Sequence, residues 1–271
     1  MSDRGVIGKW LVGLNFNPHT QLNLSRLLHS CVAKCVLVHV RNLIIFCHMF
    51  FKLMNEYSLH SAIKNWYSLP GDKFEVRIDD FIVDIVREPL LIEIQTKNVS
   101  AIKKKLTKLL ENHQVRLVYP IPQQKWIVHV TESGEIIRRR KSPKKGRLFD
   151  LFYELVRTPN LIKEENFSLE VLMIEEEEIR CNDGKGSWRR RGVSIKDRRL
   201  MNVHSKTFFK NEKDFLRFLP TYLIKPFTNK KLAKRSGVSI NLARKITYCL
   251  RKMGAITTVG KNGKELIFEV S

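Results

Sequence analysis

Two carboxylates and an amide interrupt a stretch of chain that otherwise predicts two buried strands. Residues 81–86 and 90–95 are apolar and rich in β-branched side chains, and the short segment 87–89 between them contains Pro89, so they predict a β-hairpin. The polar exceptions are Asp84, Glu93 and Gln95. An ionised carboxylate left unpaired in a protein core costs several kcal/mol, so two of them so close together indicate a site that holds a cation.

The pairing of the two strands predicts that these side chains share one face of the sheet. A turn at 88–89 pairs Asp84 with Glu93, and Gln95 falls on the same face because side chains alternate with a period of two. Directly opposed carboxylates repel each other, whereas a divalent cation such as Mg²⁺ or Mn²⁺ accepts hard oxygen ligands. The alternative is a solvated face, or a salt bridge to a nearby lysine, Lys97 or Lys105.

An Asp in one strand, followed nine residues later by Glu-Ile-Gln in the next, resembles the metal site of the restriction-endonuclease-like nucleases, usually written PD-(D/E)XK. Asp84 matches the Asp of that motif and Glu93 its second acid, while Gln95 stands where Lys is usual and Val83 where Pro is usual. The resemblance implies a Mg²⁺ or Mn²⁺ ion held by Asp84, Glu93 and the Ile94 carbonyl, with Gln95 orienting water. Gln carries no positive charge and cannot act as the cationic group that Lys provides.

A predicted helix before the hairpin extends the resemblance. Residues 54–67 form an amphipathic pattern closed by Pro70-Gly71, and Glu56 lies on the apolar stripe. In several nucleases of this superfamily a Glu from the first helix joins the site, and Glu56 is the position that matches. The alternative is that Glu56 only complements the helix dipole in the first turn.

The elements after the hairpin complete the predicted order. Residues 98–113 predict a helix, and residues 115–119 and 126–130 predict strands around a turn at 120–122. With a first strand at 74–78, the order is helix, three strands, helix and strands. This is the α-β-β-β-α-β core that the resemblance implies, and we place it at residues 54–135.

The chain is strongly basic, with a net charge of +22 and a sequence pI of about 10.0. A positive charge of this size indicates the kind of partner that the protein binds rather than its fold. Nucleic acid is the first candidate, ahead of an acidic membrane surface. The charge gathers in a basic linker, 136–147, and again at 185–192, where a Trp among arginines could stack on an exposed base. A solvated linker is the alternative. The candidate nucleic-acid contacts here are Lys97, Arg139, Arg140, Lys144, Lys145, Trp188, Arg189, Arg190 and Arg191.

Residues 226–271 predict a helix-turn-helix followed by a hairpin. Thr228 and Ser239 precede two helical patterns as N-caps, and Gly254 follows the second as its C-terminal stop. Strands at 255–259 and 265–270 complete a pattern that resembles a winged helix, whose second helix would enter the major groove. The alternative is a protein-interaction module. The candidate contacts are Asn241, Arg244, Lys245 and Lys261.

The remaining segments carry weaker patterns. Residues 148–225 predict an α+β connector, with a second winged-helix-like unit as one option, and the acidic run 175–178 predicts a solvated face or pairing with arginines rather than a metal site. Residues 1–53 form a poorly defined N-terminal extension with an apolar stretch short of a membrane span. Met54 stands directly before the first predicted helix, so a natural start there is one interpretation, and a membrane- or partner-binding segment is the other.

The sequence therefore predicts an α/β protein that hydrolyses nucleic-acid phosphodiesters with a metal ion, as a DNA endonuclease does. The alternative is a non-catalytic DNA-binding or regulatory protein on a degenerate nuclease scaffold, which the missing Lys favours. We expect Mg²⁺ or Mn²⁺ as the metal, nucleic acid and above all DNA as the partner, no small-molecule cofactor and no membrane partner. Five scattered cysteines predict the reducing cytoplasm. A monomer and a homodimer both remain open.

Overall fold

The computed structural model of this chain describes residues 59–221, 223 and 226–271. Glu56 and the N-terminal extension 1–53 lie outside the described residues. The described residues belong to one compact unit. None of the helices among them is long and apolar enough to cross a membrane.

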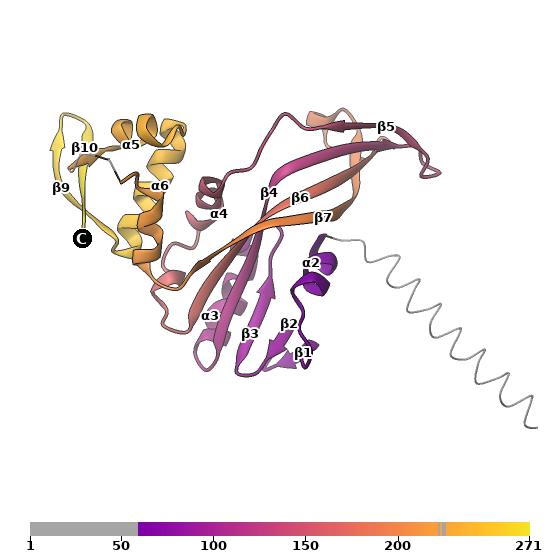
Figure 1. Ribbon diagram of the computed structural model, residues 1–271, viewed down its shortest axis with the longest axis horizontal. Coiled ribbons are helices and arrows are strands. Elements are labelled where there is room, and N and C mark those ends of the chain that lie inside the picture. Colours follow the sequence, from indigo (N-terminus) through magenta and orange to yellow (C-terminus); the bar gives the residue numbers. More distant parts are fainter. Residues whose placement is uncertain (1–58, 222, 224–225) are drawn as a thin grey trace, which may run out of the picture. The chain divides into compact units, whose positions relative to one another are not determined.

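A seven-stranded mixed sheet forms the larger part of the fold (Figure 1). Its strands follow the spatial order β1-β2-β3-β4-β6-β7, and β5 pairs with β4 beyond the end of β3. β3, β4 and β6 run parallel to one another, and the other pairs are antiparallel. The strands are β1 (Lys73–Ile78), β2 (Phe81–Arg87), β3 (Leu90–Ile94), β4 (Gln114–Val130), β5 (Ile136–Lys141), β6 (Phe167–Asn182) and β7 (Val193–Phe209).

The prediction of a mixed α/β fold is confirmed. The described residues begin with a helix, three strands, a 3-10 segment, a helix and a strand. Helix α2 (Leu59–Tyr67) precedes the sheet, and α3 (Lys103–Leu110) connects β3 to β4, as a parallel pair requires a crossover. The shorter helical segments are η2 (Val99–Ile102), η3 (Leu148–Leu151), α4 (Phe152–Leu155), η4 (Leu161–Lys163), η5 (Trp188–Arg190) and η6 (Glu212–Phe218).

Three expectations about the long strands are wrong. The predicted turn at 120–122 is absent, because β4 continues through it as one strand with an irregularity between Pro122 and Gln124. The predicted basic linker 136–147 begins with β5, which pairs with β4. The predicted connector 148–225 contributes β6 and β7 to the main sheet instead of folding by itself. In each case long-range strand pairing outweighs the local turn and charge signals.

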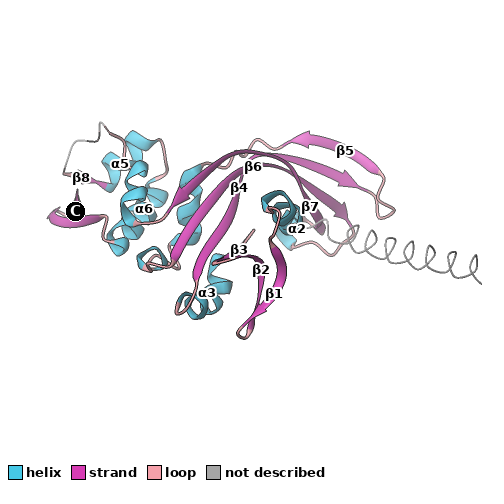
Figure 2. Ribbon diagram, turned by 60° about the horizontal axis from the view of Figure 1, so that its bottom comes forward, coloured by secondary structure: helices cyan, strands magenta, loops and turns pink. Residues whose placement is uncertain are grey.

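Each face of the sheet carries a hydrophobic cluster. On one face, α2 packs over Ile85, Ile92 and Val118, and Figure 2 shows this helix on the concave side of the bent long strands. On the other face, α3 packs over Leu91 and Leu117. The strand residues therefore alternate between two cores, which is the pattern expected of a sheet covered on both sides.

The C-terminal part is a helix-turn-helix followed by a hairpin. Its elements are β8 (Phe227–Thr228), α5 (Asn229–Ser236), α6 (Ile240–Met253), β9 (Ile256–Asn262) and β10 (Glu265–Val270), and β8 and β9 flank β10 in a three-stranded antiparallel sheet. The predicted caps are confirmed. Thr228 and Ser239 accept hydrogen bonds from the N–H groups of Lys231 and Leu242, and Gly254 ends α6 in the left-handed region at φ 91°.

The C-terminal part shares a hydrophobic core with the rest of the described chain. Ile246 and Leu250 of α6 belong to the same cluster as Phe152 and Phe215, and α6 contacts α4 directly. The Arg147 guanidinium donates hydrogen bonds to the carbonyl oxygens that end α5, at 2.9 Å from Ser236 and 2.7 Å from Gly237. These contacts join the helix-turn-helix to the sheet.

Candidate metal centre

The β2–β3 hairpin has the predicted register. Arg87 pairs with Leu90 across a turn at 88–89, and Ile85 pairs with Ile92, so the next positions along the two strands are Asp84 and Glu93. The hydrogen-bonded ladder ends at Ile85 and Ile92. The two carboxylates therefore lie where the strands begin to separate, and Glu93 is 3% exposed.

Asp84 lies in the gap that opens between the strands. Its Oδ2 atom accepts a hydrogen bond from the Ile94 N–H at 2.8 Å and is 3.1 Å from His60 Nε2 of α2. The N–H and C=O groups of one strand residue point to the same side, so the Ile94 carbonyl also faces this gap. The register is as expected, but the Asp84 carboxylate turns toward α2 instead of standing beside Glu93 on one face.

Glu93 points toward the opposite helix, where Lys105 compensates its charge. Lys105 Nζ lies 2.5 Å from Glu93 Oε1 and donates a hydrogen bond to the Ile82 carbonyl at 2.5 Å. Leu106 and Leu109, which are fully buried, fix this face of α3 on the sheet. The salt bridge that the sequence offered as an alternative is therefore present, and it comes from Lys105.

The pKa values of Asp84 and Glu93 are shifted in opposite directions although the two acids are neighbours. Burial, and then the negative charge of Asp84, raise the pKa of Glu93 to about 7 in spite of Lys105. Burial also opposes ionisation of Asp84, but the His60 hydrogen bond and charge and the Ile94 N–H outweigh it and lower the pKa of Asp84. The Asp84 hydrogen bond in turn raises the pKa of His60. At neutral pH the site holds one firmly ionised acid and one that is close to its titration point.

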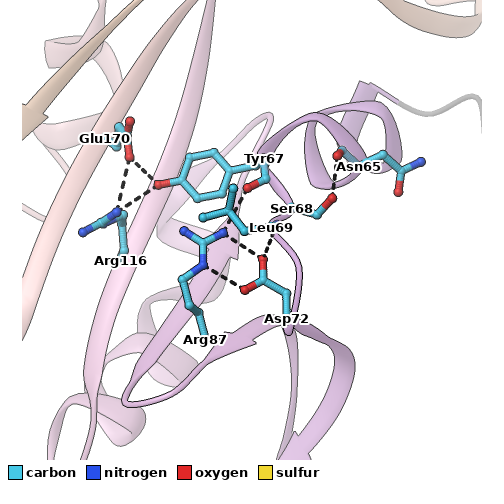
Figure 3. Close-up of polar contacts among 8 residues, drawn as sticks. All are labelled: Asn65, Tyr67, Ser68, Leu69, Asp72, Arg87, Arg116 and Glu170. Carbon is cyan, nitrogen blue, oxygen red and sulfur yellow. Dashed lines mark hydrogen bonds and ion pairs between the residues drawn. The ribbon is translucent and has the colours of Figure 1, made fainter.

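A buried polar cluster fixes α2 and hence His60 (Figure 3). The Tyr67 hydroxyl donates to Glu170 of β6, and Arg116 of β4 lies 3.1 Å from the Tyr67 oxygen and 3.6 Å from Glu170. The Arg87 guanidinium donates to both Asp72 carboxylate oxygens at 2.8 Å and to the Tyr67 carbonyl at 3.0 Å. Residues of β2, β4 and β6 therefore hold the C-terminal end of α2, and His60 lies in the first turn of the same helix.

Gln95 and Lys97 belong to the turn after β3. The Gln95 side-chain amide donates to the backbone carbonyl of Lys97 and, at 3.3 Å, to that of Asn98. The expectation that Gln95 faces the two acids is therefore wrong, because the chain leaves the sheet after Ile94 and the amide satisfies the carbonyls of the turn. Lys97 is exposed.

A second acidic group, the run 175–178, lies within β6 and is paired with cations. Lys125 Nζ is 2.7 Å from Glu176 Oε1 and 3.1 Å from Glu178 Oε2, and Arg180 is 2.6 Å from Glu178 Oε1. The burial of Glu176 and Glu178 is thus compensated by Lys125 of the neighbouring strand β4 and by Arg180 of β6 itself. This agrees with the predicted pairing with cations rather than with a metal site.

The predicted nucleic-acid contacts on the long strands have different surroundings. Arg139 is engaged, with an ion pair to Glu177 at 2.8 Å and its guanidinium 3.9 Å from the centre of the Trp126 ring. Trp188 is 82% exposed, with the Arg189 guanidinium 5.6 Å from its ring centre. Arg140 is half-buried. The exposed members are Lys144, Lys145, Arg189, Arg190 and Arg191.

The candidates in the C-terminal part divide in the same way. Asn241 and Arg244 are exposed on α6, and Lys261 is exposed on β9. Lys245 is half-buried, with its ammonium 5.9 Å from the centre of the Tyr153 ring of α4. Lys245 therefore faces α4 rather than the surface that Asn241 and Arg244 share.

The donor set at the β2–β3 gap suits a small hard cation. Among the described residues, no three His, Cys, Asp or Glu side chains gather closely enough to hold a metal ion on their own. Mg²⁺ does not need such a group, since it keeps several water ligands and takes one or two carboxylates together with substrate phosphates. Asp84, Glu93 and the Ile94 carbonyl have oxygen atoms of this kind, but the Asp84 carboxylate is turned toward α2 and that of Glu93 toward α3.

Of the two residues that accompany the acids, Lys105 was expected from the sequence only as a salt-bridge partner, and His60 was assigned no role in the site. His60 follows Glu56 by four positions on the same predicted helix, so the stripe that carries Glu56 also carries His60. Lys105 borders the apolar stripe of α3 between Ile102 and Leu109, which marks it as the lysine of the run 103–105 that can face the sheet.

Comparisons with known proteins cover the larger part of the chain. The family described as a domain of unknown function, DUF8091, matches residues 57–210, a region that ends directly after β7. A protein of Treponema pallidum (strain Nichols), described as an uncharacterized protein, is 32% identical over 214 residues, which cover 79% of this chain and 84% of the relative. No solved structure matches the chain significantly. The chain therefore belongs to the DUF8091 family.

Proposed function

We propose that this protein is a metal-dependent nuclease of the restriction-endonuclease-like type, which hydrolyses phosphodiester bonds in nucleic acid and binds DNA through a C-terminal winged helix. The observation that carries this proposal is the pair Asp84 and Glu93 at the point where β2 and β3 separate, with a lysine 2.5 Å from Glu93. Two adjacent acids with unequal pKa values beside a cation are typical of functional sites. The element order from α2 to β4 supports the same superfamily.

The residues of the site have distinct parts in the proposed reaction. Asp84, Glu93 and the Ile94 carbonyl would hold a divalent cation, which lowers the pKa of water and stabilises charge on the phosphate when it is bound. His60 orients Asp84 through its hydrogen bond. Lys105 supplies the positive charge that Gln95 lacks, since its ammonium already lies against Glu93.

The second candidate function is a non-catalytic DNA-binding scaffold. One observation favours it: Lys105 and a protonated His60 together balance the charges of Glu93 and Asp84 without a metal. A cleavage assay on a mixture of single- and double-stranded DNA and RNA, with Mg²⁺ and with a chelator, separates the two functions. Cleavage that needs the metal supports the nuclease, and metal-independent binding without cleavage supports the scaffold.

We expect Mg²⁺ binding to depend on pH around the pKa of Glu93. Because this pKa is raised to about 7, the carboxyl must release a proton to bind metal at lower pH. The apparent affinity should rise about tenfold for each pH unit below 7 and level off above it. Titration calorimetry at pH 6, in buffers of different ionisation enthalpy, should detect the released proton. Glu93→Gln should release none, and an affinity constant between pH 5.5 and 7 would contradict the assignment.

The same pKa has a consequence for the metal-free protein. The unfolded Glu93 carboxyl, with its ordinary pKa near 4.5, binds fewer protons than the folded one between about pH 4.5 and 7. The contribution of Glu93 to the free energy of unfolding should therefore fall as pH rises through this range. Denaturant titrations of the metal-free chain and of Glu93→Gln measure it.

We expect Arg244 to contribute to DNA binding and Lys245 to contribute less. Arg244 is exposed near the start of α6, whereas Lys245 faces Tyr153. Losing an arginine that contacts a base costs about 1–3 kcal/mol, so Arg244→Ala should weaken duplex binding about 5- to 150-fold. Fluorescence anisotropy at several salt concentrations measures this, with Lys245→Ala as the control of equal charge change. Equal losses in the two variants would assign the effect to net charge alone.

A further inference from the structure

A cavity of about 330 Å³ lies along β4, next to the end of β3. β3 pairs with β4 as far as Val118, and β5 pairs with β4 only from Trp126. Between Val118 and Trp126, this edge of β4 pairs with neither strand. The chain that follows β5 returns to the edge there, and the Gly146 N–H donates to the Pro122 carbonyl at 2.9 Å. The cavity occupies the interval left open, and its floor includes Tyr119 and Ile121.

Two prolines stabilise this opening. The Gln95 N–H donates to the Val118 carbonyl, so the backbone groups of Val118 point toward β3, and those of Pro120 and Pro122 point to the same side. Proline has no N–H, so this edge leaves no donor without a partner where no strand pairs with it. The Pro120 carbonyl, in contrast, points into the open interval as an acceptor.

The walls combine aromatic surface with groups that donate and accept hydrogen bonds. Tyr119 lies on the floor, and its hydroxyl makes no hydrogen bond to another described residue. Burial and the nearby charge of Glu154 raise the pKa of Tyr119 to about 12, so the hydroxyl stays a neutral donor. Tyr153 also lines the cavity and is 45% exposed, with the Lys245 ammonium 5.9 Å from its ring centre. The carboxylates of Asp150 and Glu154 also line the cavity, and each already accepts a hydrogen bond at 3.0 Å, from the Arg147 and Val99 N–H groups.

Most of the charged groups that line the cavity already interact with neighbouring residues, so a neutral occupant would leave these interactions intact. Of its cations, Lys125 is paired with Glu176 and Glu178, and Arg180 is paired with Glu178. Lys144 is exposed at the rim, where a phosphate could lie. A volume of about 330 Å³ is at the lower end of the range for small-molecule pockets, roughly 300–1,000 Å³. Aromatic walls, mixed donors and acceptors and this size together fit a nucleobase.

The cavity is within reach of the proposed metal centre. Glu93 lies opposite Leu117 in the β3–β4 register, and Tyr119 is two residues further along the same strand and on the same face. Two residues of a strand span about 7 Å. Successive nucleotides of one strand rise by about 3.4 Å each, so a base one or two nucleotides from the phosphate at Glu93 can reach the cavity.

We propose that this cavity receives an unpaired nucleobase from the strand that crosses the metal centre, so that the substrate is nucleic acid with single-stranded or unpaired nucleotides beside the cleaved bond. This inference rests on the proposed function, which supplies nucleic acid as the ligand. The base stacks on Tyr153 and hydrogen-bonds the Tyr119 hydroxyl and the Pro120 carbonyl. Lys144 contacts the phosphate of the same nucleotide.

The test compares two fluorescent single strands of equal length, one with bases and one with abasic sugars at every position. Binding to the full chain is measured by anisotropy in a chelator, so that cleavage does not enter. Tyr153→Ala should weaken binding of the base-containing strand by at least about fivefold, the scale of losing one base–aromatic stack, and leave the abasic strand unchanged. Tyr153→Phe keeps the ring and should bind as the unmodified protein does.

The possible outcomes test base binding in the cavity independently of the proposed hydrolysis. Equal losses on both strands would show that Tyr153 acts through the fold or the phosphates, and no loss on either would show that no base stacks there. Both results overturn the inference but leave the nuclease proposal standing. A base-dependent loss in a protein that never cleaves would support the inference and overturn the hydrolysis. As a second measurement, a strand with 5-iodouracil should photo-crosslink to Tyr119 or Tyr153, and crosslinks confined to other residues would contradict the pocket.

Discussion

Replacement of Asp84 by asparagine is expected to reduce Mg²⁺-dependent cleavage by about 10²- to 10³-fold, the scale of removing one preorganised electrostatic group from an active site. Asn keeps the shape of the side chain, and its oxygen can still accept from the Ile94 N–H, so the hairpin should stay folded. The lost negative charge removes a metal ligand and the partner of His60. DNA affinity should be unchanged or slightly higher, because repulsion of phosphate decreases. Cleavage and binding are measured on the same substrate.

Asp80→Asn is the matched control for this substitution. Asp80 is exposed in the turn before β2, so the same chemical change there should alter neither cleavage nor metal binding. If Asp84→Asn cleaves at the unmodified rate, Asp84 is not a metal ligand. If the unmodified protein binds DNA but neither Mg²⁺ nor Mn²⁺ in calorimetry, the scaffold function replaces the nuclease.

Replacement of Lys105 by methionine should have an effect of similar size and a different signature. Met fills much of the same space without a charge, so Glu93 loses the cation 2.5 Å away that opposes its raised pKa. The pKa of Glu93 should rise further, and cleavage should fall by about 10²-fold, with the pH profile displaced to higher pH. If Lys105 had only a structural role, its replacement would lower the cleavage rate without shifting the pH profile of cleavage.

Two further variants test whether the effect comes from the charge of Lys105 itself. Lys104→Met removes the neighbouring exposed ammonium and should leave the pH profile in place. Gln95→Lys, introduced together with Lys105→Met, restores a lysine at the position where the superfamily usually carries it. Partial recovery of cleavage would indicate that the two positions supply the same charge. Loss of activity in Lys104→Met equal to that in Lys105→Met would instead point to the overall charge of α3.

The register of the hairpin could be predicted because it depends on local signals. A turn at 88–89 and two apolar strands are sufficient to oppose Asp84 and Glu93. The partners of these acids do not depend on local signals alone, because His60 and Lys105 approach from helices on opposite faces of the sheet. The apolar stripe of α3 indicates that Lys105 can face the sheet, but whether its ammonium reaches Glu93 depends on how Leu106 and Leu109 pack.

The long strands could not be predicted for a related reason. Pro120 and Pro122 favour a turn locally, yet both are tolerated in β4 because their missing N–H groups face the unpaired interval of the edge. The acidic run in β6 likewise gives no strand signal by itself. It is compatible with a buried strand only because Lys125 and Arg180 lie where they can neutralise it. Arg180 is close to this run in the sequence, but Lys125 and the strands that pair with β4 are distant from the segments they stabilise.

The contacts between α6 and α4 have a consequence for how this protein unfolds. Phe152 and Phe215 are fully buried in a cluster that also contains Ile246 and Leu250, and Arg147 holds the end of α5. The helix-turn-helix therefore contributes to the core that supports the sheet, and the two should melt together in one cooperative transition. A substitution in the apolar side of α6 would then lower the population of folded sheet as well, because the two parts unfold as one unit.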